Sequence, residues 1–125
     1  MNALTVLAVA LAGGLGAAAR LLVDGVVRAR VPASFPVGIM LVNVTGSLLL
    51  GLFTGLALGG LVAPAWQLVL GAGLMGGYTT FSTASYETVR FVQDGRYLAA
   101  LTNGLGMLVA SVPASGLGLW LGLQF

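Results

Sequence analysis

The chain has no histidine, no cysteine and no lysine, and five arginines and three acidic residues are the only charged side chains among its 125 residues. These absences exclude histidine-based proton transfer, thiol chemistry, disulfides, Schiff-base lysines and Cys/His zinc sites. The acids Asp24, Glu87 and Asp94 are too dispersed to suggest a carboxylate metal cage. The pI of about 9.7 comes from arginines in an apolar chain. We therefore expect neither enzymatic activity nor a nucleic-acid partner.

Charge is scarce and apolar residues are abundant. Hydrophobic residues make up 58% of the chain, charged residues 6%, and the mean hydropathy is +1.06. A soluble domain carries about a quarter charged residues. A membrane-spanning helix needs about 20 largely apolar residues, so this length holds four of them with short loops. We expect an all-α integral membrane protein, with one four-helix domain over residues 1–125, embedded in the lipid bilayer of the cell membrane (plasma or inner).

Four apolar runs predict the spans. They cover approximately residues 3–23, 37–58, 66–90 and 97–123. Between the first two runs the chain is polar, and Asp24 is predicted to cap a short interfacial helix there. A signal peptide is the alternative interpretation of the first run, because Ala17–Ala19 resemble a cleavage site. The missing positive side chain before it and the equally apolar sequence after it argue against that alternative.

Glycine is frequent inside the spans, with 20 in the chain. Because apolar helices gain little from the hydrophobic effect in lipid, close packing through small residues matters there. Two ridges with four-residue spacing are predicted to be packing surfaces: Gly51, Gly55 and Gly59, and Gly118 and Gly122. Four helices form a bundle too thin to enclose a protected pathway, so we expect an oligomer.

Polar residues occur at membrane depth at helical spacing. They are Asn43 and Ser47 in the second span, Thr80, Thr83 and Glu87 in the third, and Asn103, Ser111 and Ser115 in the fourth. Such groups are costly in lipid and should face the bundle interior or a water-filled path. A single serine or threonine often bonds back to its own helix, whereas an asparagine amide needs other partners. Uncharged donors suit a small anion that must bind and leave.

The third span contains a segment that predicts a helix break, Gly76-Gly-Tyr-Thr-Thr-Phe-Ser-Thr83. Unwound backbone at this depth is tolerated only where it is buried in protein or lines a cavity. Free carbonyls at a break can coordinate a cation, and free amides can receive an anion. The segment therefore indicates an ion site, with a flexible glycine kink as the alternative.

Three sequence blocks, at residues 13–20, 38–47 and 76–83, resemble the signature blocks of the Fluc (CrcB) fluoride channel family. The resemblance implies a passive fluoride channel that lowers cytoplasmic fluoride, assembled as an antiparallel, dual-topology dimer with two pores. It also implies a structural Na⁺ at the dimer centre, held by backbone carbonyls. By motif position these carbonyls belong to Gly76 and Thr79 of each subunit.

The same resemblance implies roles for several side chains. Asn43 matches a pore-lining amide, and Phe81 matches the first of two pore phenylalanines, whose ring edges carry positive potential. Ser111 and Glu87 fall in a polar pore track. Thr80, Thr83 and Asn103 join the candidate pore residues, and Arg20, which ends the first block, is a further candidate. The second phenylalanine is Ala84 here, and Tyr86 or a residue of the partner subunit is the expected substitute.

The distribution of arginine bears on the dimer. In the four-span arrangement all five arginines lie near one side of the membrane. The positive-inside rule then predicts mainly one orientation, with the termini outside. Two assemblies are therefore expected as alternatives: a homodimer that contains both orientations, and a heterodimer with an oppositely oriented paralogue.

Two alternative functions have different requirements. A small dual-topology, proton-coupled multidrug exporter needs a carboxylate deep in a span, typically the first. The first span has no acid, and Glu87 lies toward the end of the third. A non-transporting assembly subunit would use its polar residues only to join helices, and the broken third span fits that role poorly.

Overall fold

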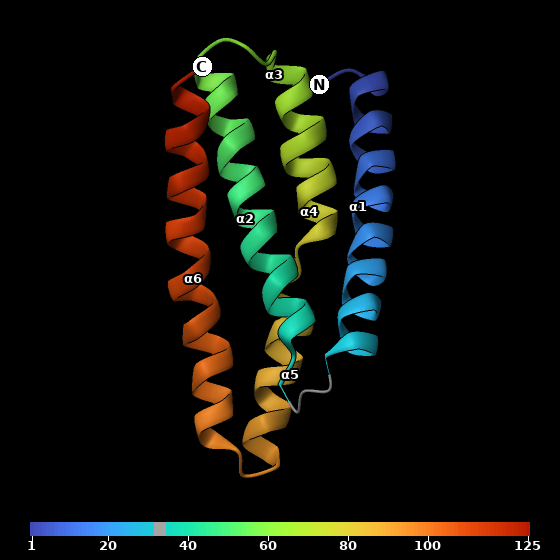
Figure 1. Cartoon of the computed structure of the whole chain (residues 1–125). Coiled ribbons are helices and arrows are strands. Elements are labelled where there is room, and N and C mark those ends of the chain that lie inside the picture. The colour runs from blue at the N-terminus through green and yellow to red at the C-terminus, as the bar shows by residue number, and fades with distance from the viewer. Residues whose placement is uncertain (32–34) are drawn as a thin grey trace.

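The computed structural model describes residues 1–31 and 35–125, and every regular element in that part of the chain is a helix. Three helices are long: α1 (Ala3–Arg30), α2 (Val37–Leu58) and α6 (Tyr97–Leu123). Each of them is long and apolar enough to cross a bilayer. Both termini lie at one end of the bundle, and the turn from α5 to α6 lies at the other (Figure 1). The expected all-α membrane architecture is confirmed.

The third span is interrupted, as predicted. It begins with α3 (Pro64–Gln67), continues as the π-helical η1 (Leu68–Met75) and α4 (Gly76–Tyr78), and resumes as α5 (Ser82–Gln93). Between α4 and α5 the backbone leaves the helical region, with Thr79 at φ −78° and ψ 159°. The break therefore begins two residues after the paired glycines, inside the segment that predicted it.

The first helix is longer than the predicted span. The prediction of a short interfacial helix capped by Asp24 was wrong, because α1 runs without interruption to Arg30 and contains Asp24. Asp24 instead pairs with Arg28 one turn later, with 2.9 Å between Arg28 Nε and Asp24 Oδ2. A pair of opposite charges at this spacing supports the helix that contains it, so the polar residues extend α1 rather than end it.

The glycine ridges pack α2 against α6. A Cβ added to Gly118 would overlap the Leu48 carbonyl oxygen, and one added to Gly51 would overlap the Ser115 carbonyl oxygen. By contrast, a Cβ at Gly116 would have no atom within 4 Å beyond its own helix. Close backbone contact through small residues is how apolar helices associate in lipid. The ridges therefore act in packing, as predicted.

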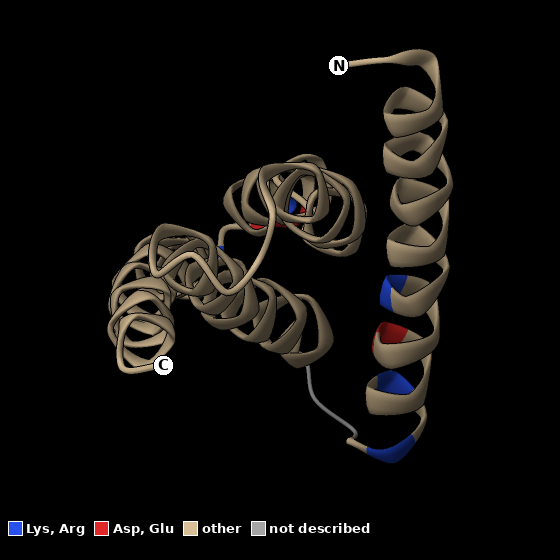
Figure 2. Ribbon diagram, turned by 90° about the horizontal axis from the view of Figure 1, so that it is seen from above, with Lys and Arg blue, Asp and Glu red and all other residues tan. Residues whose placement is uncertain are grey.

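The two halves of the broken helix pack against different neighbours. η1 and α4 lie against α1, where a Cβ at Gly77 would overlap the Gly13 carbonyl oxygen. α5 lies against α6 instead. Seen from above, α1 stands at the side of the other helices, with its charged residues in the half nearer its C-terminal end (Figure 2). The break is thus the point where the third span passes from one neighbour to the other.

Candidate functional site

A groove of about 540 Å³ lies between α2, the break and α5, and α6. Six of the predicted site residues line it: Asn43, Thr79, Thr80, Phe81, Asn103 and Ser111. Its other lining residues are Ser47, Leu50, Ala84, Ser85, Thr88, Val89, Gly104, Met107 and Leu108. No lining residue of this groove in the described part of the chain carries a charge. The folding of three separate segments therefore brings together most of the polar residues that the sequence places at membrane depth.

Asn43 holds the backbone of the break. Its Oδ1 accepts a hydrogen bond from the Thr80 N–H, and its Nδ2 donates to the Thr80 carbonyl, both at 2.8 Å. Nδ2 also lies 2.9 Å from the Met107 sulfur. Asn43 and Thr80 are both buried, at 9% and 6% exposure. The side chain supplies the partners that a continuous helix would have given Thr80, which allows unwound backbone at this depth.

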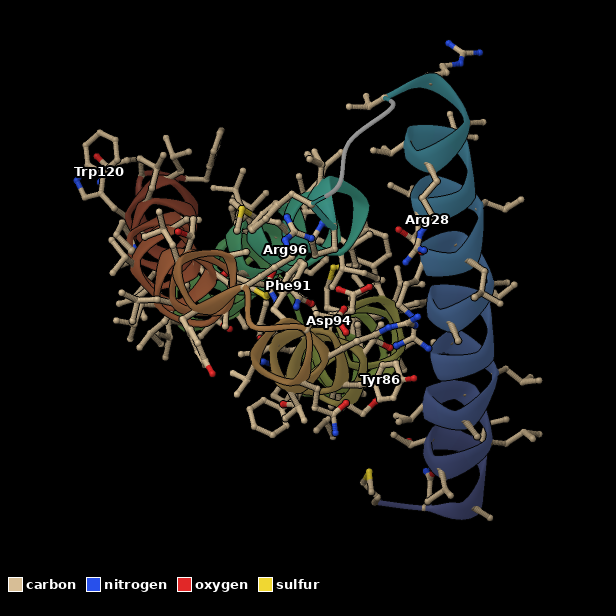
Figure 3. The ribbon with its side chains drawn as sticks, turned by 90° about the horizontal axis from the view of Figure 1, so that it is seen from below. Arg28, Tyr86, Phe91, Asp94, Arg96 and Trp120 are labelled. Atoms are coloured by element: carbon tan, nitrogen blue, oxygen red, sulfur yellow. The ribbon has the colours of Figure 1, made fainter. Side chains whose placement is uncertain are left out.

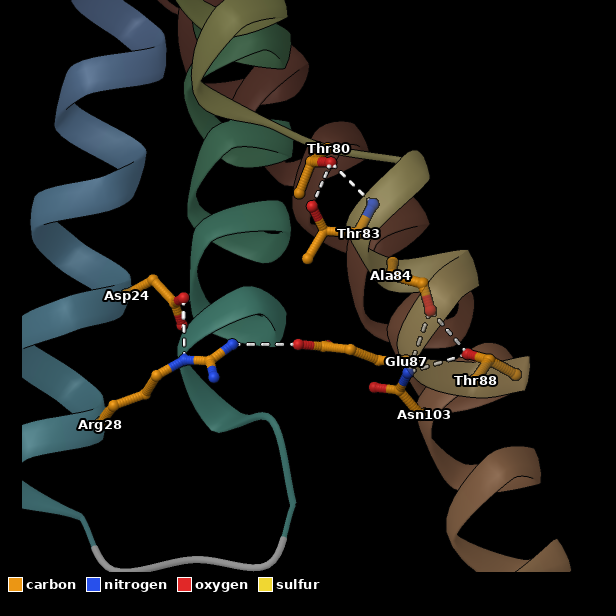
Figure 4. Close-up of polar contacts among 8 residues, drawn as sticks. All are labelled: Asp24, Arg28, Thr80, Thr83, Ala84, Glu87, Thr88 and Asn103. Atoms are coloured by element: carbon orange, nitrogen blue, oxygen red, sulfur yellow. Dashed lines mark hydrogen bonds and ion pairs between the residues drawn. The ribbon is translucent and has the colours of Figure 1, made fainter. Parts of the chain in front are cut away.

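Thr80 in turn organises the start of α5. Its hydroxyl oxygen accepts a hydrogen bond from the Thr83 N–H at 3.1 Å and lies 3.2 Å from the Thr83 hydroxyl (Figure 4). The first N–H groups of a helix lack partners within it, and Thr80 satisfies one of them. Because Thr80 lies in the break and α5 begins at Ser82, Thr80 is not on the helical face of Thr83 and Glu87 that the spacing predicted.

Asn103 joins α6 to α5. It is fully buried, and its Nδ2 donates to the Thr88 hydroxyl at 2.8 Å and to the Ala84 carbonyl at 3.4 Å (Figure 4). Its Oδ1 is buried and has no hydrogen-bond partner within residues 1–31 and 35–125. Both asparagines therefore use their amide protons inside the protein in this conformation.

Several helical hydroxyls bond back to their own helix. The residues whose hydroxyl donates to a carbonyl four residues earlier include Thr45, Ser47, Thr54, Thr88 and Thr102. Ser111 differs: its hydroxyl oxygen is buried, lines the groove and has no partner in the described part of the chain. The described residues therefore leave the hydrogen-bonding capacity of the Ser111 hydroxyl unused.

Phe81 and the backbone around it lie at the rim of the groove. The Phe81 side chain is 88% exposed although it is large and apolar. On the other side of the break, Arg20 of α1 donates from Nη1 to the Thr79 carbonyl at 3.3 Å. No backbone N–H in residues 1–31 and 35–125 donates to the Gly76 carbonyl across the break, since the Thr80 N–H bonds to Asn43 instead. The break thus leaves the Gly76 carbonyl without a backbone partner across it, and the Thr79 carbonyl accepts from the Arg20 guanidinium.

Glu87 lies apart from the groove. It lines a separate cavity of about 480 Å³ where α1, the start of α2 and α5 meet, and it forms an ion pair with Arg28. Figure 3 shows Phe91, Asp94 and Arg96 gathered at this end of the bundle. The Arg96 guanidinium lies 4.7 Å from the centre of the Phe91 ring. This end of the bundle is therefore charged, whereas the groove is not.

Comparison with known proteins assigns the family. Residues 7–123 match the family model described as CrcB-like protein, Camphor Resistance (CrcB). The chain belongs to the CrcB-like family. It is 61% identical over 122 residues to a protein of Leifsonia xyli named fluoride-specific ion channel FluC 1, covering 98% of this chain and 89% of that protein. It is 40% identical over 119 residues to fluoride-specific ion channel FluC of Pyrococcus abyssi, covering 94% and 95%.

Membership of the CrcB-like family confirms the predicted resemblance and supports a channel rather than an enzyme. The multidrug-exporter alternative gains no support. Its essential feature is a carboxylate deep in a span, and Glu87 is instead paired with Arg28 at the end of the bundle. Tyr86, named as a substitute for the second phenylalanine, is 65% exposed and does not line the groove of its own chain.

Sequence reasoning missed the partners of the two asparagines in this CrcB-like chain. Met107 lies midway between Asn103 and Ser111 at four-residue spacing on α6, yet only the fold places its sulfur on Asn43. Thr88 was not among the candidates, although its hydroxyl receives the Asn103 amide. Arg28 was also missed, and its four-residue spacing from Asp24 was the available signal. Periodicity identifies the face of a helix but not the residue that meets it.

Proposed function

We propose that this chain is a subunit of a passive, fluoride-specific channel that lets fluoride leave the cell across the cell membrane. The observation that carries the proposal is the groove, because it lies within the predicted spans, has no charged lining residue and contains the unpartnered Ser111 hydroxyl. The relatives named as fluoride-specific ion channels support the choice of ion. A pore must replace the water of a strongly hydrated anion with donors that bind it and release it.

The side chains of the groove divide into two groups in this proposal. Ser111, with its free hydroxyl, and Phe81, with its positively polarised ring edge, contact the anion. Asn43 and Asn103 hold the break and α5 in place, since their amide protons already have partners. The pore-lining role implied for Asn43 is thus proposed to act through the geometry of the Thr80 backbone.

A second subunit completes the pathway. The groove opens to the surface of the single chain, and Phe81 at its rim is 88% exposed. An antiparallel partner would cover the groove and bury the ring, giving two pores in a dimer. A homodimer and a heterodimer with an oppositely oriented paralogue both satisfy this requirement. The names FluC 1 and FluC 2 among the relatives are compatible with paired paralogues.

A structural Na⁺ at the dimer centre is part of the proposal. Na⁺ is a hard cation that takes oxygen ligands, and unwound carbonyls at broken membrane helices supply them. The Gly76 carbonyl fits, because no backbone N–H donates to it across the break within residues 1–31 and 35–125. The Thr79 carbonyl has a second lone pair beside the one that Arg20 uses. When bound, the ion would neutralise carbonyl dipoles brought together from two subunits.

Replacing Ser111 with alanine tests the groove as the pathway. Fluoride efflux from liposomes is expected to fall about tenfold or more, because a hydrogen bond to a charged group is worth about 1.5–3 kcal/mol and about 1.4 kcal/mol corresponds to a factor of ten. The melting temperature in detergent is expected to stay the same or rise, since the variant removes a buried hydroxyl that has no partner among the described residues. Ser115→Ala, one turn along α6 and outside the groove, serves as the control. Unchanged efflux in Ser111→Ala would place the pathway elsewhere.

A further inference from the structure

Three charged side chains form a cluster between α1 and α5. Arg28 lies between two carboxylates, with Nε 2.9 Å from Asp24 Oδ2 and Nη2 3.1 Å from Glu87 Oε1 (Figure 4). The Arg28 side chain is 60% exposed, whereas those of Asp24 and Glu87 are 16% and 15% exposed. The second oxygen of each carboxylate is buried and has no hydrogen-bond partner in residues 1–31 and 35–125. Arg28 is therefore the bridge between two largely buried negative charges.

Glu87 is close enough to the groove for its charge to act there. It follows Ala84 by three residues and precedes Thr88 by one, and both of these residues line the groove. Residues three apart on a helix have Cβ atoms about 5–6 Å apart. This separation is shorter than the Debye length of about 8 Å at physiological ionic strength. An uncompensated carboxylate at position 87 would therefore repel an anion in the groove.

The geometry points to Arg28 as the counter-ion that makes the groove passable to anions, by cancelling the charge of Glu87. This inference rests on the proposed fluoride channel and assigns a role to a residue outside all three signature blocks. The groove itself has no charged lining residue in the described part of the chain. The field along it is therefore set by charges just outside. Two of these, Glu87 and Arg90, lie on α5 within a turn of residues that line the groove, and Glu87 is the negative one, which pairs with Arg28. Arg28 acts through Glu87 and is a positioning residue in this sense.

A double-mutant cycle that neutralises each charge tests the role of Arg28. Fluoride efflux is measured from liposomes that contain equal amounts of wild type, Arg28→Gln, Glu87→Gln or the double variant, at low and at high ionic strength. We expect Arg28→Gln to lower efflux about tenfold at low ionic strength and much less at 1 M salt, where the Debye length is about 3 Å. The double variant should recover at least half of the lost efflux, since it also removes the carboxylate that Arg28→Gln leaves uncompensated. Arg28→Lys, which keeps the charge, should also recover it.

The controls separate electrostatics from structure. Arg30→Gln removes an exposed charge from the same helix end and is expected to leave efflux unchanged. If Arg28→Gln does not fold, Glu87→Gln alone decides, because the counter-ion role predicts equal or higher efflux and a tenfold loss overturns it. Equal efflux in Arg28→Gln and wild type, or a loss that neither salt nor the second substitution reverses, also overturns the role. A wild type that carries no fluoride refutes the channel itself, and the counter-ion role with it.

Discussion

Replacing Asn43 with alanine is expected to abolish fluoride efflux and to lower the free energy of unfolding by about 2–6 kcal/mol. The substitution removes both hydrogen bonds to Thr80 and leaves its N–H and carbonyl buried without partners. Each unsatisfied buried group costs about 1–3 kcal/mol. Because Thr80 also caps the start of α5, the loss extends to the orientation of the second half of the broken helix. Efflux from liposomes and thermal unfolding in detergent measure the two effects.

Asn43→Ser is expected to have an intermediate effect on efflux and stability. A serine hydroxyl can donate and accept, but its single oxygen lies one bond closer to the backbone than the amide atoms of Asn43 that bind the Thr80 N–H and carbonyl. Serine should therefore replace these bonds only in part, and efflux and stability should fall between those of wild type and Asn43→Ala. Thr54→Ala is the matched control on α2, because the Thr54 hydroxyl only bonds back to the Leu50 carbonyl. Equal losses in Asn43→Ser and Asn43→Ala would contradict a role for Asn43 in hydrogen bonding to the break.

Replacing Gly118 with alanine is expected to prevent stable packing of α2 against α6. The added Cβ would overlap the Leu48 carbonyl oxygen, which belongs to the backbone and cannot turn away as a side chain does. Overpacking of this kind costs about 1–3 kcal/mol and sometimes more. We expect little monodisperse protein after extraction and a melting temperature lower by several degrees.

Gly116→Ala is the control for this prediction. It adds the same methyl group to the same helix two residues earlier, where no atom outside the helix lies within 4 Å. Alanine favours helix over glycine by about 1 kcal/mol in soluble hosts, so this variant should be as stable as wild type or more stable. If Gly118→Ala and Gly116→Ala have the same yield and melting temperature, close contact at Gly118 is not needed for stability.

The sequence predicted the fold more fully than the site. The apolar runs gave the helices, and the paired glycines of the third run marked the break, because both features depend on local composition. α1 was misjudged at Asp24, where a pair with Arg28 continues the helix that polarity suggested would end. Periodicity correctly placed Asn43 with Ser47, and Asn103 with Ser111, on shared faces that line the groove, but it wrongly placed Thr80 on the face of Thr83 and Glu87.

The partners of those polar residues did not follow from the sequence. The amide protons of Asn43 bind the protein itself, because folding places the Thr80 carbonyl and the Met107 sulfur against them. Ser111 has no such partner in the described part of the chain, and nothing in its spacing distinguishes it from Ser115. The Glu87 side chain points toward α1, where it forms an ion pair with Arg28. Contacts between helices decided each of these outcomes.

Fluoride efflux from liposomes that contain the purified protein, with chloride efflux as the control, tests the central claim most directly. The experiment is run with and without Na⁺, and with and without a co-expressed paralogue. The proposed channel predicts passive fluoride efflux down its gradient, with chloride retained. No fluoride efflux under any of these conditions, or equal efflux of fluoride and chloride, would contradict it.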